Sequence, residues 1–229
     1  NKHGQSLKLL DKAIAIEPKE ALFHGAKGDI FFNRKQFDYA LNAYDRAIYL
    51  NDNYFYFYEK RGLIHKQLGN HANAIQDLKR SSDLLPTAIA YNELGQFALK
   101  SGDTSGAKHF FIKAASSNSR AGKSALHSYT KLDIPDNPQK YVQVRWKENN
   151  KNDAVFKIYN LSPLPLYNIS LKINFHNDKG ERYYLPIHLP DVIAPKKNVL
   201  FSIDDQTIGA KYQHTITIDV ISAQAVTQR

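Results

Sequence analysis

The sequence ALNAYDRA at residues 40–47 carries the pattern that decides the fold, with Ala40, Tyr44 and Ala47 as its small, large and small positions. The pattern recurs three times, as SLKLLDKA, AIQDLKRS and AKHFFIKA, at residues 6–13, 74–81 and 107–114. Successive copies begin 34, 34 and 33 residues apart. Residues spaced four and three apart share one helical face, and small residues there let a neighbouring helix approach closely. The spacing therefore predicts a repeat built from pairs of helices.

Two further sets of residues keep this step, namely Gly28, Gly62 and Gly95, and Pro18, Asp52 and Pro86. Together they resemble the tetratricopeptide repeat over roughly residues 1–118, with glycine in the first helix, the small–large–small stripe in the second, and proline at its end. We expect helix pairs at 21–34 with 37–50, 55–68 with 71–84, and 88–101 with 104–117.

The match has departures and an incomplete start. Lys27 and Arg61 stand immediately before two of the glycines, where the family usually has an apolar residue, and Asp52 replaces the closing proline. The first copy has only its second helix, because Asn1 stands shortly before Ser6. We therefore expect the chain to be a piece of a longer protein.

The pattern changes its period near Pro135 and Pro138, which stop a helix and indicate a linker at 135–140. Just before it, residues 121–132 are expected to form a helix that caps the array. Beyond it, apolar residues alternate in six sets, which begin at Val142, Phe156, Ile169, Tyr183, Val199 and Ile216. Such short strands are typical of an antiparallel sandwich, and the turn sequence at 177–180 indicates a hairpin.

These observations give a multidomain α and β chain. Residues 1–134 form a tetratricopeptide helical-repeat array, with half a repeat, three full repeats and a capping helix. Residues 141–229 form an antiparallel β-sandwich, which is similar to small immunoglobulin-like domains of bacterial envelope proteins.

Composition excludes several kinds of chemistry. The chain has no cysteine, which rules out disulfides, thiolate catalysis and cysteine-based metal sites. Its net charge of +9 is divided between 19 Lys and Arg against 13 Asp and Glu in residues 1–134, and 12 against 9 in residues 135–229. Because no run of cations exceeds Lys196-Lys197, we expect solvated surface charge rather than a nucleic-acid site. No apolar run is long enough for a transmembrane helix.

No catalytic constellation is present in the sequence. Nine histidines are scattered without an H-E-x-x-H pair, and Gly122-Lys123-Ser124 lacks the first glycine and the preceding strand of a phosphate-binding loop. We therefore expect this chain not to be an enzyme, and to hold no metal and no cofactor.

The resemblance implies that the first helices of the repeats line a concave groove that holds a peptide or a partner protein. Carried over by repeat position, the groove residues are Leu22, Asp29, Phe32, Asn33, Tyr56, Glu59, Lys60, Leu63, Lys66, Gln67, Ile89, Asn92, Gln96 and Lys100. Relatives that grip a terminal carboxylate carry lysine and asparagine where this chain has Gly25 and Asp29, so that clamp is expected to be absent.

The aromatic run YFYFY at residues 54–58 has two interpretations. On a helix its members point in different directions, so some must enter the core while Tyr56 or its neighbours reach the groove. Exposed rigid aromatics often dominate binding, but core packing is the favoured interpretation of the run.

Three short stretches, at 20–25, 61–63 and 83–88, look like the C-terminal repeat region of Gram-negative zinc metallopeptidases related to BepA and HtpX. That resemblance implies a non-catalytic module attached to an upstream peptidase domain, in the periplasm or at the cell envelope. The alternative is an envelope scaffold or assembly factor with no protease attached. A cytoplasmic location and a nucleic-acid-associated repeat protein are the other hypotheses.

Overall fold

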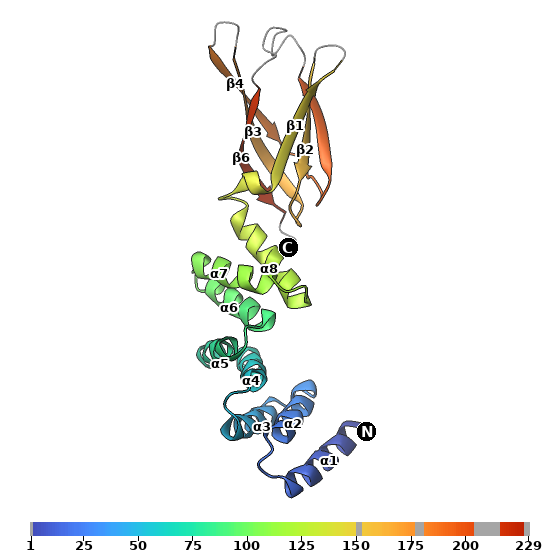
Figure 1. Ribbon diagram of the computed structural model, residues 1–229, viewed down its shortest axis with the longest axis vertical. Coiled ribbons are helices and arrows are strands. Elements are labelled where there is room, and N and C mark those ends of the chain that lie inside the picture. The colour runs from blue at the N-terminus through green and yellow to red at the C-terminus, as the bar shows by residue number, and fades with distance from the viewer. Residues whose placement is uncertain (1, 150–152, 177–180, 204–215, 227–229) are drawn as a thin grey trace. The chain divides into compact units, whose positions relative to one another are not determined.

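The computed structural model describes residues 2–149, 153–176, 181–203 and 216–226 (Figure 1). The chain divides into two compact units, residues 1–126 and residues 127–229. The division lies within a helix, a few residues before the predicted linker, whose limits stay a prediction. The first unit is helical and the second is built from strands.

The helical unit contains the predicted helix pairs. The helices are α1 Lys2–Ile16, α2 Ala21–Asn33, α3 Phe37–Leu50, α4 Phe55–Gln67, α5 His71–Leu84, α6 Ala88–Lys100, α7 Thr104–Ala115 and α8 Arg120–Asp133. Within the repeats α2 packs on α3, α4 on α5, and α6 on α7, while α3 contacts α4 and α5 contacts α6. The helix boundaries agree with the predicted ones to within two residues.

The small–large–small stripe forms the core of each pair. Tyr44 and Phe111 are completely buried, as are the small residues four before and three after them. The glycines explain how the helices come so close: a Cβ on Gly28 would lie 2.9 Å from the Tyr44 ring, and one on Gly95 would lie 2.6 Å from the Phe111 ring. The repeat pattern is therefore a packing pattern, because each glycine makes room for the large residue of the following helix.

Turns between paired helices also recur by repeat. Lys35, Gly69 and Gly102 occupy equivalent positions after α2, α4 and α6, and all three have a positive φ, of 57°, 78° and 85°. Glycine adopts this left-handed conformation without strain, which explains its use in two of the three turns.

Lys27 and Arg61, which precede two of the glycines, form ion pairs between helices. Lys27 Nζ lies 2.7 Å from Asp11 Oδ1, and Arg61 Nη1 lies 2.6 Å from Asp45 Oδ1. Both pairs span 16 residues and join the second helix of one repeat to the first helix of the next. Arg61 also donates from Nε and Nη2 to Asp77 on α5, at 2.8 and 2.7 Å. The departure from the family pattern thus replaces apolar packing with ionic contacts.

The second unit contains the six predicted strands. They are β1 Val142–Glu148, β2 Ala154–Asn160, β3 Leu166–His176, β4 Arg182–Leu189, β5 Asn198–Ile203 and β6 Thr217–Ala225, preceded by the short helix η1 Pro138–Lys140. They form two antiparallel three-stranded sheets, in the orders β1-β2-β5 and β4-β3-β6. The predicted hairpin turn at 177–180 lies outside the described residues.

The two sheets share one apolar core. Ile158 of β2 and Leu171 of β3 belong to one buried cluster, and Phe156 and Ile173 belong to another. The immunoglobulin-like assignment is not confirmed, because the described strands make two sheets of three, whereas the constant-type immunoglobulin fold has seven strands in sheets of four and three. What the structure shows is two small antiparallel sheets packed through their apolar faces.

Candidate functional site

The predicted groove residues lie on the three first helices. Leu22, Asp29, Phe32 and Asn33 belong to α2, the six residues from Tyr56 to Gln67 belong to α4, and Ile89, Asn92, Gln96 and Lys100 belong to α6. The repeat register places them at equivalent positions along successive helices. No observation tests whether they contact a partner, so their role stays a prediction.

Several of these residues hold neighbouring repeats together. Asp29 Oδ1 accepts hydrogen bonds from the hydroxyls of Tyr44 and Tyr56, at 2.7 and 2.8 Å. Burial, followed by the hydrogen bond to Asp29, raises the pKa of both tyrosines above the usual value of 10.0. This carboxylate therefore links α2 to both α3 and α4.

Similar contacts join α4 to its neighbours. The Lys60 ammonium lies 5.2 Å from the Phe32 ring centroid and 5.1 Å from that of Tyr56. The Thr87 hydroxyl donates to Glu59, and the same oxygen caps α6 by accepting from the Ala90 N–H at 3.0 Å. Glu59 is only 4% exposed, so its carboxylate stabilises the array rather than offering surface to a partner.

A hollow of about 560 Å³ opens on this surface beside α4 and α6. Its lining residues are Lys66, Asn92, Glu93, Gln96, Leu99 and Lys100. Sequence reasoning named four of them and missed Glu93 and Leu99. Leu99 occupies the repeat position of Phe32 and Lys66, and Glu93 occupies that of Lys60, so the same register would have found both. Only the tertiary structure reveals that Glu93 forms an ion pair with Lys66.

Asn92 is the unusual residue in this hollow. It is 9% exposed, and its Oδ1 is fully buried without a hydrogen-bond donor within the described part of the chain. This oxygen is an acceptor, so the group that it needs is a hydrogen-bond donor. A buried polar group without a partner costs about 1–3 kcal/mol, so a ligand N–H that reaches this oxygen would gain from the bond.

The aromatic run at 54–58 divides between core and surface. Phe57 is buried, and a Cβ on Gly25 would lie 2.3 Å from its ring, so Phe57 fills the space that this glycine leaves. Tyr54 packs edge-on against Phe57, with ring centroids 4.8 Å apart. Tyr56 is half-buried and engaged with Asp29, so core packing accounts for much of the run.

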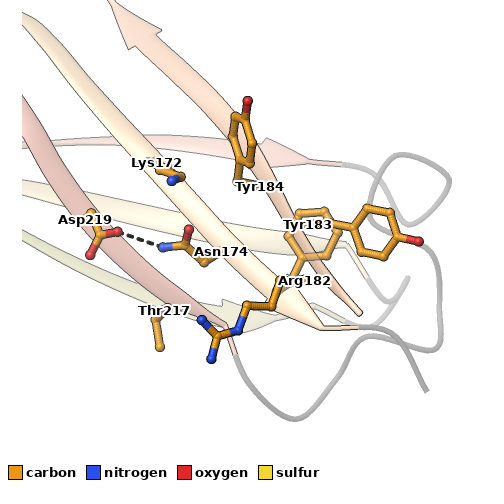
Figure 2. Close-up of a pocket in the computed structure, with 8 residues that line it drawn as sticks. Lys172, Asn174, Arg182, Tyr183, Tyr184, Thr217 and Asp219 are labelled. Carbon is orange, nitrogen blue, oxygen red and sulfur yellow. Dashed lines mark hydrogen bonds between the residues drawn. The ribbon is translucent and has the colours of Figure 1, made fainter. Parts of the chain in front are cut away.

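Figure 2 shows a second hollow, of about 450 Å³, on the outer face of the sheet β4-β3-β6. Asn174 donates to Asp219 at 2.8 Å, and the Lys172 ammonium lies 4.6 Å from the Tyr184 ring centroid. The sequence pattern does not predict this hollow. Lys172 and Asp219 already have partners, and the remaining charged residue of the lining is Arg182, so charge alone does not specify a ligand.

Neither a metal-binding cluster nor a membrane-spanning helix occurs in the described ranges. No group of three or more His, Cys, Asp or Glu residues there is arranged to hold a metal ion. Across the same residues, no helix combines the length and the hydropathy needed to cross a bilayer.

Comparison with known proteins identifies the repeats. Residues 28–69 match a TPR repeat model, and residues 55–86 match a tetratricopeptide repeat model. Over 101 residues the chain is 33% identical to the BBSome complex member BBS4 homolog of Drosophila melanogaster, which covers 43% of this chain and 20% of that protein. Over 78 residues it is 35% identical to the small glutamine-rich tetratricopeptide repeat-containing protein 2 of Mycosarcoma maydis, covering 34% and 22%. The matches thus span about a fifth of these relatives.

Solved structures share the helical architecture. A MamA protein superposes with a TM-score of 0.50 at 18% identity, covering 58% of this chain and 72% of that one. YrrB superposes with a TM-score of 0.50 at 16% identity, covering 55% and 64%. At this identity the likeness concerns the fold alone. Together with the matches over residues 28–86, it supports tetratricopeptide repeats within the helical unit.

Proposed function

We propose that the helical unit binds an extended peptide segment of another protein in the hollow beside α4 and α6. The observation that carries this proposal is Asn92, whose buried amide oxygen has no hydrogen-bond donor among the described residues. An extended peptide presents a backbone N–H at every residue other than proline, so it would supply the missing donor. The resulting bond would replace an unsatisfied group with a satisfied one, which favours the bound state.

The charges around Asn92 indicate the sequence that the peptide should have. Lys66 is neutralised by Glu93, whereas Lys100 is exposed and has no ion-pair partner in the described ranges. Leu99, between them in the lining, is 37% exposed. We therefore expect a segment with an acidic residue for Lys100 and an apolar residue for Leu99.

The test begins with selection of a random peptide library, displayed on phage, against the full chain. Affinity of a selected peptide is then measured by fluorescence anisotropy for the wild-type chain and for Asn92→Leu. Loss of a hydrogen bond to a buried group should weaken binding about 5- to 150-fold. Asn73→Leu is the matched control, because Asn73 is an exposed asparagine on the second helix α5.

Lys100 is tested in the same assay. Lys100→Gln should weaken binding and reduce its salt dependence, while Lys79→Gln, which removes an exposed charge from α5, should do neither. Selected peptides that bind equally well to Asn92→Leu would place the binding site elsewhere and refute the proposal.

A finer assignment rests on the sequence resemblance alone. We propose that this module is the accessory region of a zinc metallopeptidase of the Gram-negative envelope, which would place it in the periplasm. The alternative remains an envelope scaffold or assembly factor. An H-E-x-x-H domain encoded upstream of Asn1 supports the first, and a signal peptide without such a domain supports the second.

A further inference from the structure

The outer face of the sheet β1-β2-β5 is a grid of nine side chains. Strand register aligns them in three rows across the sheet. The rows are Lys147, Val155 and Ser202, then Arg145, Lys157 and Leu200, then Gln143, Tyr159 and Asn198. All nine are exposed or half-exposed, and the alternate residues of the same strands enter the core. The face therefore presents three cations and, in these outward positions, no acidic residue.

The two central cations contact the same aromatic ring. Arg145 and Lys157 are directly opposite each other in the antiparallel register. Their charged groups lie 5.3 and 5.2 Å from the centroid of one ring, that of Tyr159. Like charges in opposed positions destabilise a sheet, and within the described part of the chain neither cation has an ion-pair partner. The repulsion would be relieved by an external anion.

The sequence does not reveal that these three cations share one face, because they are not consecutive. The unit from His127 to Arg229 has 13 Lys and Arg against 10 Asp and Glu, a surplus of three. The number of cations on this one face is equal to the net positive charge of the whole unit. The sequence pattern predicts dispersed surface charge, because Arg145, Lys147 and Lys157 do not form a run. The pleat and the register bring them onto one face, since alternate residues of a strand point the same way.

We propose that this face docks on an anionic lipid surface. A membrane surface matches a flat cationic face, and it also accommodates the apolar Leu200, which is 61% exposed in the same row as the two central cations. Tyrosine beside lysine and arginine is the composition found at membrane–water interfaces. Single-stranded nucleic acid suits the face less well, because the cations already occupy the Tyr159 ring on which a base would stack.

The test is co-sedimentation of the full chain with vesicles of phosphatidylcholine alone and with added phosphatidylglycerol. Binding should require the anionic lipid and should weaken as salt is added. Each cation near an anionic surface contributes about a fivefold gain in partitioning, so Arg145→Gln/Lys147→Gln/Lys157→Gln should bind about a hundredfold more weakly. Lys147→Gln alone should bind about fivefold more weakly. Because the Lys147 side chain makes no described contact, this single variant should fold normally and can be tested even if the triple variant misfolds.

The matched control removes three cations of the same unit from other surfaces, as Lys131→Gln/Lys172→Gln/Arg182→Gln. This control should keep most of the anionic-vesicle binding. Folding of each variant is checked by the fluorescence of Trp146, the single tryptophan, which packs with Phe156 in the core of this unit. Equal loss in the control, absence of binding by the wild-type chain, or tighter face-dependent binding to single-stranded DNA would each overturn the proposal.

Discussion

Asn92 provides the most decisive test of how this chain functions. If its amide has no partner in the free protein, replacing it with an apolar side chain of similar shape should stabilise the fold. Asn92→Leu removes a buried unsatisfied polar group, which costs about 1–3 kcal/mol, and leucine has a higher helix propensity than asparagine by roughly 0.5 kcal/mol. Leucine keeps the branching at Cγ, so little cavity is created. We expect the free energy of unfolding to rise by about 1–3 kcal/mol.

The assay is urea unfolding followed by far-ultraviolet circular dichroism at the helical band. In the described residues all the α-helices except the end of α8 belong to the helical unit, so this signal reports the stability of that unit. The control Asn73→Leu changes an exposed position on α5 and should alter the free energy of unfolding by no more than about 0.5 kcal/mol. A variant that is more stable yet loses peptide binding would separate function from folding.

The result that refutes this reasoning is equally clear. If Asn92→Leu lowers the free energy of unfolding by more than the control does, the amide is already hydrogen-bonded in solution. The observation that carries the proposed peptide site would then be gone. Most substitutions of buried residues destabilise, so a stabilising result is not expected by chance.

Three further predictions concern the helical unit. Gly95→Ala should lower the free energy of unfolding by about 1–3 kcal/mol, because its Cβ would meet the Phe111 ring, whereas Gly4→Ala, with no atom within 4 Å, should raise the melting temperature. Arg61→Met leaves the buried Asp77 carboxylate without its main partner and should lower the free energy of unfolding in urea by about 3–5 kcal/mol. The lost contact with Asp45 should add little, because that carboxylate is exposed to solvent. The double variant Arg61→Met/Asp77→Leu should recover most of the lost stability. The pKa of Tyr44 is raised above 10.0 in the folded state, so its contribution to the free energy of unfolding is fully present below pH 10 and is lost as the pH rises further. Tyr44→Phe should therefore make the free energy of unfolding fall less steeply above pH 10. An unchanged dependence of that free energy on alkaline pH would contradict the buried hydroxyl–carboxylate pair.

Much of the fold was predictable because its signals are local. The spacing of Ala40, Tyr44 and Ala47 specifies a helical face and requires no knowledge of the rest of the chain. The alternation in the second half likewise predicted six strands, because residues two apart share a face. In the helical unit Ala40, Tyr44 and Ala47 are completely buried, as that helical face requires. Fold topology was less accessible, since pairing β2 with β5 and β3 with β6 depends on contacts between distant segments.

The candidate site was only partly predictable. Repeat register predicts Asn92 and Lys100 as groove residues, and both line one hollow. It did not reveal that Asp29, Tyr56 and Glu59 are bound to neighbouring repeats, since a polar residue on a helix surface looks the same whether it contacts solvent or another helix.

The sequence by itself determined the repeat, the helices and the strands of this protein, because hydrophobic periodicity is a property of consecutive residues. Tertiary structure alone decided which polar groups are satisfied and which are not. Among the described residues the amide oxygen of Asn92 has no donor because of how the helices pack around it, and Arg145 and Lys157 become neighbours only through the register of β1 with β2. Hydrogen bonds and charge repulsion depend on distances of a few ångströms between segments far apart in the chain, and no local pattern encodes those distances.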